Sequence, residues 1–299
     1  CIGDTILLIS ALGYLYLQTK KKVLIATLYK ELTENCEYLD VLDDFGEEKI
    51  DYCNFKNIVE SGINPIFITA TDFVSINGSY QPIWGKEHML LNICSKVGVD
   101  SIINVAPTLI LNEKEKREGR FYSKSQIAIV SSGNQKYKSI PLELAQSVVN
   151  NLKSIYNFVQ VGSLEDPLLE NVLDKREWGG LRGVASILYN SDLYVGGIGG
   201  LMHMSRAVKC RAVIAYSSAE PLYWCNYACN INVTCKCPEC EQCGKNVSFP
   251  YLTNCKNDYS CVKNISSESM EKAINFQMTK TGTPLEETYH LVKPKKVLG

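Results

Sequence analysis

The chain has no excess of charge of either sign. Its 31 Lys and Arg residues nearly balance 32 Asp and Glu, so the formal net charge is -1. A basic surface is the usual electrostatic basis of nucleic-acid binding, and we therefore expect no nucleic-acid partner. The hydrophobic share of 45% and the charged share of 21% are ordinary for a globular protein, and 299 residues can bury two domain-sized cores.

Apolar runs with the features of a membrane anchor or a signal peptide are also missing. The run at residues 6–17 is too short to span a bilayer. No basic segment precedes it and no small-residue cleavage site follows it, as a signal peptide would require. We predict a buried helix of an α/β layer, no transmembrane segment and a cytoplasmic location, and we leave peripheral membrane contact open. Because the chain starts at Cys1 and no strand precedes its first loop, we expect that a first strand is missing.

A G-x-G-x-x-G dinucleotide fingerprint opens neither half of the chain, which argues against a Rossmann oxidoreductase. Apolar strand patterns alternate with helical patterns along both halves, as in α/β proteins with parallel sheets. The predicted strands are residues 23–27, 50–52, 64–69, 126–131, 157–161, 192–195 and 211–216. The predicted helices are residues 5–19, 28–35, 84–97, 142–155, 167–173, 184–190 and 267–277.

The charged run at residues 113–120 has few apolar positions and is predicted to be a solvated linker. It divides the chain into two Rossmann-like domains, residues 1–120 and 121–280. A polar tail at residues 281–299 follows, either without fixed structure or folded back. Ligands of such sheets bind at the carboxyl ends of the strands, so we expect a site in a cleft between the two domains.

The cysteines do not form the evenly spread framework of a disulfide-rich secreted protein. Eight of the 13 crowd residues 225–261, and the other five are scattered singly. Overlapping C-x-x-C pairs with two later cysteines can supply the four thiolates of a structural zinc or iron site. A surface thiol cluster or a disulfide pair is the alternative. The predicted ligands come from Cys237, Cys240, Cys243, Cys255 and Cys261.

A glycine-rich stretch follows one of the predicted strands of the second half. Gly196, Gly197, Gly199 and Gly200 precede a helical pattern that contains His203. Strand, glycine turn and helix together often form an anion site, because glycine admits a ligand to the backbone and the first helical N–H groups are unpaired. A tight turn with His203 as a capping or packing residue is the alternative.

Other polar residues could complete such a site. Asp4 could act as a general base, or could serve only to stabilise a helix N-terminus. Ser131, Ser132 and Lys138 could bind a diphosphate, or belong to a solvated basic loop. Glu165, which follows the strand predicted before it, could accept hydrogen bonds from ribose hydroxyls, or cap the next segment.

These features together resemble glycosyltransferase family 9, the heptosyltransferase-like enzymes of bacterial surface glycan synthesis, over nearly the whole chain. Residues 2–8 resemble the N-terminal G-D motif of the family, and residues 138–141 resemble its K-x-W-P. Gly162 with Glu165 resembles the strand end that carries a ribose-binding acid. Residues 199–203 resemble D-S/T-G-L-x-H, which wraps the donor diphosphate, and the last cysteines resemble those before the family's final helix.

The resemblance implies a GT-B fold in which an acceptor domain and a donor domain face a cleft, with a cysteine-rich metal-binding insertion at residues 225–261. It implies inverting, metal-independent transfer of a sugar, with ADP-heptose as the expected donor and a glycan, a lipid-linked molecule or a protein as acceptor, in lipopolysaccharide or related synthesis. Asp4 would be the catalytic base. The donor contacts would be Ser131, Ser132, Lys138, Glu165, Gly199, Gly200, Leu201, Met202 and His203.

The crowded cysteines also resemble the autotransporter heptosyltransferase branch, in which four cysteines hold iron, and a homo-oligomer is left open. Two departures separate this chain from the family pattern. Ile198 and Gly199 stand where the family carries an acid and a hydroxyl residue, and Ile140 stands where Trp is usual. The missing carboxylate motivates a second hypothesis, a catalytically degenerate protein of the same fold that binds a nucleotide or glycan or scaffolds an assembly.

Overall fold

The computed structural model describes residues 1–41, 87–133, 135–218, 220–235, 255 and 257–282, together with the backbone of three strands at residues 72–76, 79–83 and 288–289. The strands predicted at residues 50–52 and 64–69 lie outside the described residues.

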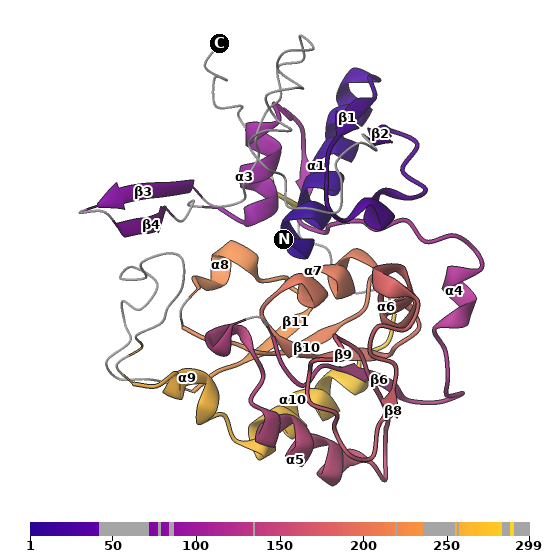
Figure 1. Ribbon diagram of the computed structural model, residues 1–299, viewed down its shortest axis with the longest axis vertical. Coiled ribbons are helices and arrows are strands. Elements are labelled where there is room, and N and C mark those ends of the chain that lie inside the picture. Colours follow the sequence, from indigo (N-terminus) through magenta and orange to yellow (C-terminus); the bar gives the residue numbers. More distant parts are fainter. Residues whose placement is uncertain are drawn as a thin grey trace.

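Six parallel strands form the main sheet, in the order β11-β10-β9-β6-β7-β8 (Figure 1). The chain builds β7 and β8 outward from β6, then returns to build β9, β10 and β11 on the other side, so the order reverses between β6 and β9. This is the strand order of dinucleotide-binding folds, whose ligands lie at the carboxyl ends beside the reversal. The strands are β6 (Gln126–Ile129), β7 (Asn157–Gln160), β8 (Leu173–Asp174), β9 (Leu193–Gly197), β10 (Ala212–Ala215) and β11 (Asn230–Val233).

Helices cover both faces of this sheet. The helices α5 and α10 lie on the face away from the N-terminal elements, and α6, α7 and α8 lie between the sheet and those elements (Figure 1). Every residue of β6 and β10 is buried, as expected for parallel strands covered on both faces. The bounds are α5 (Leu142–Leu152), α6 (Gly180–Tyr189), α7 (Gly200–Ala207), α8 (Leu222–Cys225), α9 (Ser260–Lys263) and α10 (Ser267–Met278).

Local sequence signals explain several of these elements. The inner face of α5 follows helical spacing, with Leu144, Val148 and Leu152 buried. At α10 the N-cap is Ser266, whose side chain accepts the N–H of Ser269 at 3.2 Å. Both predicted helices are therefore confirmed, although their bounds shift by a few residues.

The helix predicted at residues 167–173 is wrong. The segment is irregular with a turn at residues 170–171, and a side chain of β7 binds its backbone: the amide of Gln160 donates to the carbonyl of Pro167 at 2.8 Å and accepts the N–H of Leu169 at 2.8 Å. The segment ends in β8, which pairs with β7 in parallel. Backbone groups that are satisfied by side chains in this way have no need of helical partners.

The N-terminal half has only short strands among its described residues. The strands β1 (Val23–Ile25) and β2 (Leu39–Val41) pair in parallel, and β3 (Asp72–Ile76) and β4 (Ser79–Ile83) form an antiparallel hairpin. Part of the polar tail folds back, since β12 (Thr288–Tyr289) pairs with β5 (Ile103–Asn104). The helical elements are α1 (Ile2–Thr19), the 3-10 helix η1 (Lys30–Thr33), α3 (Met89–Lys96) and α4 (Glu115–Glu118).

The helix α1 is longer than the apolar run at residues 6–17, which by itself is too short to span a bilayer. It has 18 residues and a mean hydropathy of 1.2, so by length and composition alone it could cross a membrane, which corrects that argument. Of the residues in this 18-residue window, 44% are buried inside the protein. The helix packs against α3 and α7. The structure thus supports the prediction of a core helix in this position.

The charged run at residues 113–120 is more than a solvated linker. It contains α4, whose Glu115 carboxylate receives two bonds from the buried guanidinium of Arg182 on α6, at 2.6 Å and 2.5 Å. The same guanidinium donates to the carbonyl oxygens of Ile110 at 2.8 Å and of Glu31 at 3.3 Å. Arg182 therefore ties the sheet domain to η1 of the N-terminal half and to the connecting segment.

Replacing Arg182 by Met should lower the free energy of unfolding by about 3 kcal/mol, because the Glu115 carboxylate would lose its partner in a partly buried place. The double variant Arg182→Met/Glu115→Met removes both charges and should be more stable than the single variant. Urea unfolding followed by circular dichroism measures both. A single variant as stable as the wild type would contradict this role for Arg182.

Candidate active site

The carboxyl ends of β6 and β9 meet where the strand order reverses. The prediction placed four glycines in a turn here, but Gly196 and Gly197 are the last residues of β9. A methyl group at Gly197 would lie 1.8 Å from the carbonyl oxygen of Lys138, so only glycine lets the loop after β6 approach this strand. The glycine thus sets the position of the Lys138 backbone at the strand ends.

The first turn of α7 follows directly. Gly199 is its N-cap residue, and the carbonyl of Gly199 accepts the N–H of His203 at 3.2 Å. Gly199, Gly200 and Leu201 are partly exposed, whereas Met202 and His203 are buried. The first N–H groups of a helix have no partner within it and carry the positive end of the helix dipole. The exposed first turn of α7 can therefore receive an anion.

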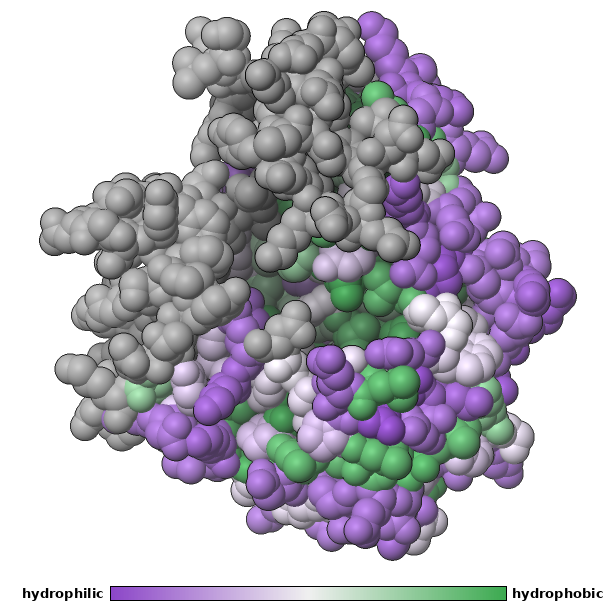
Figure 2. Space-filling model, in the orientation of Figure 1, coloured by the Kyte–Doolittle hydropathy of each residue, from purple (hydrophilic) through white to green (hydrophobic). Residues whose placement is uncertain are grey.

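The N-terminal half of the chain reaches this turn through α1. A methyl group at Gly3 would lie 2.7 Å from Cδ2 of His203, and one at Gly200 would lie 2.9 Å from Cβ of Ile2. The first turns of α1 and α7 are thus in contact with no room for larger residues. Asp4, in the same turn of α1, has 39% of its side chain exposed. Figure 2 shows that the surface is hollowed between the N-terminal elements and the main sheet, with apolar side chains in the hollow.

Lys138 forms an ion pair with Glu220, a buried carboxylate between β10 and α8. Burial, the largest single effect, lowers the pKa of the Lys138 ammonium, but the attraction and hydrogen bond of Glu220 together with Tyr137 and Cys225 raise it more, so the net pKa is raised. Lys138 is 29% exposed and Glu220 6%, so the ammonium is the more exposed member of the pair. Lys138 is therefore charged at neutral pH and is engaged within the protein.

Two buried histidines join the halves of the chain through one tyrosine. Nδ1 of His203 lies 2.6 Å from the hydroxyl of Tyr227, and the rings of His88 and Tyr227 are 5.1 Å apart. His88 is the N-cap of α3, where its Nδ1 accepts the N–H of Leu90, so the helix predicted at residues 84–97 has its first helical residue at Met89.

Both imidazoles are neutral at physiological pH. Burial lowers the pKa of His203 to about 4, against the opposing effects of Asp4 and Glu220, and the charge of Lys138 lowers it further. Burial and the neighbouring His203 lower the pKa of His88 to about 3. The influence of Asp4, Lys138 and Glu220 on one imidazole shows that these groups share one electrostatic environment.

Ser131 and Ser132 belong to the framework of the sheet rather than to this group. The buried Ser131 hydroxyl donates to the carbonyl of Pro167 at 2.6 Å, and the Ser132 hydroxyl donates to Asp166. A methyl group at Gly162, whose φ is +130°, would meet Asp166 at 2.3 Å, so this loop is closely packed. The two hydroxyl protons are therefore donated within the protein, and a role of these residues in ligand binding stays a prediction.

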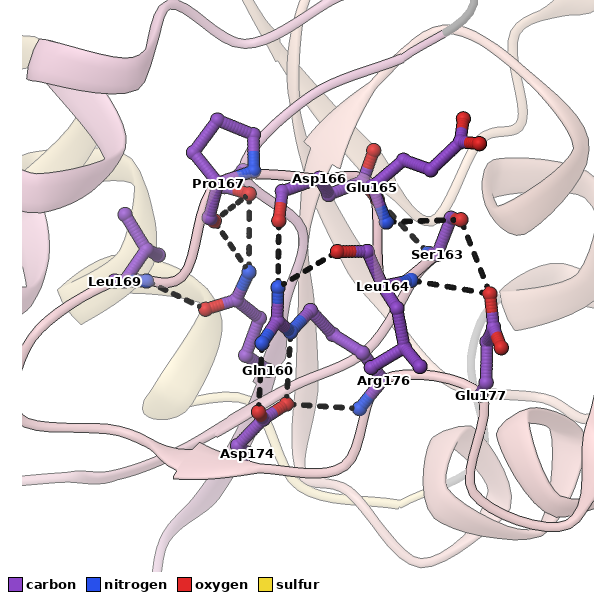
Figure 3. A network of polar contacts seen from close by, with 11 residues as sticks. Gln160, Ser163, Leu164, Glu165, Asp166, Pro167, Leu169, Asp174, Arg176 and Glu177 are labelled. Atoms are coloured by element: carbon purple, nitrogen blue, oxygen red, sulfur yellow. Dashed lines mark hydrogen bonds and ion pairs between the residues drawn. The ribbon is translucent and has the colours of Figure 1, made fainter.

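Glu165 lies in the same loop, after β7. Figure 3 shows its carboxylate directed away from a network in which Arg176 donates to the carbonyl of Asp166 at 2.6 Å and Glu177 accepts the Ser163 hydroxyl at 3.1 Å. The loop is thus held by other residues, and the exposed Glu165 side chain is available for a ligand.

A separate surface hollow of about 530 Å³ lies over α5, and none of the predicted site residues lines it.

The predicted metal ligands Cys237, Cys240 and Cys243 lie outside the described residues. Cys255 and Cys261 lie within the described residues, and Cys255 Sγ accepts the N–H of Tyr259 at 3.3 Å. Within the part of the chain that the structure describes, no three His, Cys, Asp or Glu residues gather closely enough to hold a metal ion. The structure therefore does not show the cysteine-rich metal-binding insertion.

Two residues of the site escaped the sequence analysis. Glu220 follows the strand predicted at residues 211–216 by four positions, and Tyr227 lies between Cys225 and Cys229 at the start of the cysteine-rich segment. The rule that ligands lie at the carboxyl ends of parallel strands applies to β10 as well as to β6 and β9, and it would have pointed to Glu220. Nothing local distinguishes Tyr227, because its contact with His203 depends on the folded chain.

Stability should fall as pH falls from about 6.5 to 4. The unfolded chain takes up protons on its histidines near pH 6.5, whereas His203 resists protonation until about pH 4. Protons thus favour the unfolded state within this window, and His203 alone should cost about 3 kcal/mol by its lower end. The variant His203→Asn should lose less stability over the same window, as measured by urea unfolding at successive pH values. Equal losses in both proteins would refute this explanation.

Comparisons with known proteins address the fold. No protein-family model matches the chain, and no curated protein matches it either. A family 9 glycosyl transferase from Veillonella parvula DSM 2008 matches 93% of this chain and 94% of its own, with a TM-score of 0.67 and 15% identity. The iron-containing dodecameric glycosyltransferase TibC from enterotoxigenic E. coli H10407 matches 64% of this chain, with a TM-score of 0.52 and 16% identity.

The aligned region spans only 53% of TibC, and identities this low establish the fold alone. The resemblance to family 9 glycosyltransferases that the sequence indicates is confirmed at the level of the fold. The chain has an α/β fold with a parallel sheet, similar to that of family 9 glycosyltransferases.

Proposed function

We propose that this protein is a glycosyltransferase that uses a nucleotide-activated sugar. The observation that carries the proposal is the contact between the first turns of α1 and α7 at the reversal of strand order. It brings the turn of α1 that holds Asp4 against the α7 N-terminus, and both Asp4 and Lys138 act electrostatically on His203. A transferase needs this division, because one domain must hold a donor while the other presents an acceptor.

The donor would bind with its diphosphate at the strand ends. The N–H groups at the start of α7 would donate hydrogen bonds to the diphosphate oxygens, and the Lys138 ammonium would add charge-assisted hydrogen bonds. Glu165 could bind the ribose hydroxyls, because its carboxylate is exposed at the end of the adjacent strand β7. We propose ADP-heptose as the donor on the sequence resemblance, with a glycan, a lipid-linked molecule or a protein of the bacterial surface as acceptor.

The reaction would be a single displacement that inverts the anomeric carbon. Asp4 takes the proton of the acceptor hydroxyl as its oxygen attacks, and the bond to the diphosphate breaks. Lys138 and the α7 amides stabilise the charge that develops on the departing diphosphate. His203 stays neutral and positions the two helices through Gly3 and Tyr227. The proposal assigns the chemical step to these residues and gives a metal no part in it.

A catalytically degenerate binding protein is the second candidate. Ile198 replaces the acid of the resembling motif and is buried in the core, so that it cannot contact a sugar. A protein of this kind would bind the nucleotide and transfer nothing. For the protein under either candidate function we propose a cytoplasmic location. We also propose assembly into a homo-oligomer, by analogy with the dodecameric TibC.

Replacing Asp4 by Asn should lower turnover of the nucleotide sugar by roughly 10²–10⁴-fold, since a general base typically contributes that factor. The dissociation constant for the nucleoside diphosphate should change by less than about threefold, because the base contacts the acceptor. Asp40→Asn is the matched control, since Asp40 is an exposed partner of Lys22. Turnover is measured over a panel of nucleotide sugars.

If the wild type turns over a nucleotide sugar and the Asp4→Asn variant does so at the same rate, Asp4 is not the catalytic base. Binding of nucleotide without turnover of any donor would leave the degenerate protein as the better account.

We also propose that the cysteine-rich segment binds structural zinc or iron, as the spacing of its thiols and the iron of TibC suggest. Among the described thiols, Cys235 lies beside Cys261, because the N–H of Cys235 donates to the carbonyl of Cys261 at 3.0 Å. Soft thiolate donors of this kind suit either metal. The metal would be held by four thiolates from Cys237, Cys240, Cys243, Cys255 and Cys261.

Protein purified without added metal should contain about one zinc or iron ion per chain. The variant Cys255→Ser/Cys261→Ser should lose that metal and melt at a lower temperature, whereas Cys36→Ala in the N-terminal half should keep it. Elemental analysis and thermal unfolding give the two readings. Folded wild-type protein that is free of both metals would refute the proposal.

A further inference from the structure

We propose that Glu220 holds Lys138 in the free protein as an internal substitute for a phosphate group, and that a nucleoside diphosphate must displace this carboxylate to bind. Glu220 thereby sets the affinity and charge selectivity of the donor site. The inference rests on the proposed function, because it takes the donor diphosphate to be the ligand of Lys138.

The charged partner of Glu220 is Lys138. Among the described residues, Lys138 alone forms an ion pair with Glu220. The other polar contact is the thiol of Cys225, which donates to Oε2 of Glu220 at 3.4 Å. That thiol in turn lies 3.3 Å from the hydroxyl of Tyr216. The carboxylate thus depends on one ammonium group, which is also the more exposed member of the pair.

Among the described residues, the other titratable side chains whose pKa Glu220 affects, namely Cys225, Tyr216, Tyr137 and His203, carry no charge at neutral pH. Burial raises the pKa of the Cys225 thiol, of the Tyr216 phenol and of the Tyr137 phenol on the 3-10 helix η2 (Lys136–Lys138). His203, from α7, is neutral as well because its pKa is lowered. Each of these groups feels the Glu220 charge but cannot neutralise it. A second cation for the carboxylate is therefore not supplied by its described neighbours.

A diphosphate at the first turn of α7 competes with Glu220 for the same ammonium. If Lys138 turns to the ligand, the buried carboxylate loses its partner and lies close to further negative charge, which costs free energy. Only a ligand with a high charge density can offset that cost by binding the helix amides as well. The pair thus favours diphosphates over neutral or weakly charged ligands, and it also keeps Lys138 in place when the site is empty.

Isothermal titration calorimetry at pH 8 tests this account with ADP and UDP as anionic probes, and with adenosine and uridine as their neutral counterparts. The variant Glu220→Gln keeps the shape of the side chain and removes its charge. It should bind the diphosphates about tenfold more tightly than the wild type and the neutral nucleosides equally well. A general disturbance of the site would change both kinds of ligand. Equal or weaker binding of the diphosphates by Glu220→Gln would overturn the proposal.

A measurement on the wild type covers the case in which the variant does not fold. The ¹³C signal of the Glu220 side-chain carboxyl should shift when ADP or UDP is added and should not shift with adenosine or uridine. A signal that stays in place while the diphosphate binds would also overturn the proposal. Wild-type protein that binds neither diphosphate would instead refute the proposed function, so the two failures are distinguishable.

Discussion

The contact between the first turns of α1 and α7 is the constraint on which the proposed site depends. Gly3 and Gly200 meet with no space for a side chain, and the imidazole of His203 fills the place beside them. Because α1 belongs to the N-terminal half and α7 follows β9, this contact sets the position of Asp4 relative to the strand ends. A larger residue at either glycine would separate the two halves exactly where a transferase would need them together.

The electrostatics of the site follow from that packing. His203 is buried and neutral, and the charges of Asp4, Glu220 and Lys138 all act on its pKa. The positive end of α7 is directed at the same place and is not neutralised by a capping side chain. The site therefore has two positive groups. One is the Lys138 ammonium, which is paired with Glu220, and the other is the N-terminus of α7, which no side chain caps. A polyanion is the class of ligand that uses both.

The strands β6, β7, β9 and β10 could be predicted from the sequence because they are short, largely apolar and almost wholly buried. The edge strands β8 and β11 are less buried and were not predicted. The failures have physical causes. Residues 167–173 have helical composition, but Gln160 from a neighbouring strand binds their backbone. The charged run at residues 113–120 appeared solvated because its partner Arg182 is distant in sequence. In the same way Glu220 could not be paired with Lys138, since ion pairs across a sheet leave no periodic pattern along the chain.

Hydrogen exchange with and without a nucleoside diphosphate tests the central claim most directly, because it reports on individual segments of the unmodified protein. The account predicts that ADP or UDP slows exchange in peptides that cover residues 130–139 and 198–206, the two segments at the reversal of strand order. Protection confined to other parts of the chain, such as the hollow over α5, would contradict it.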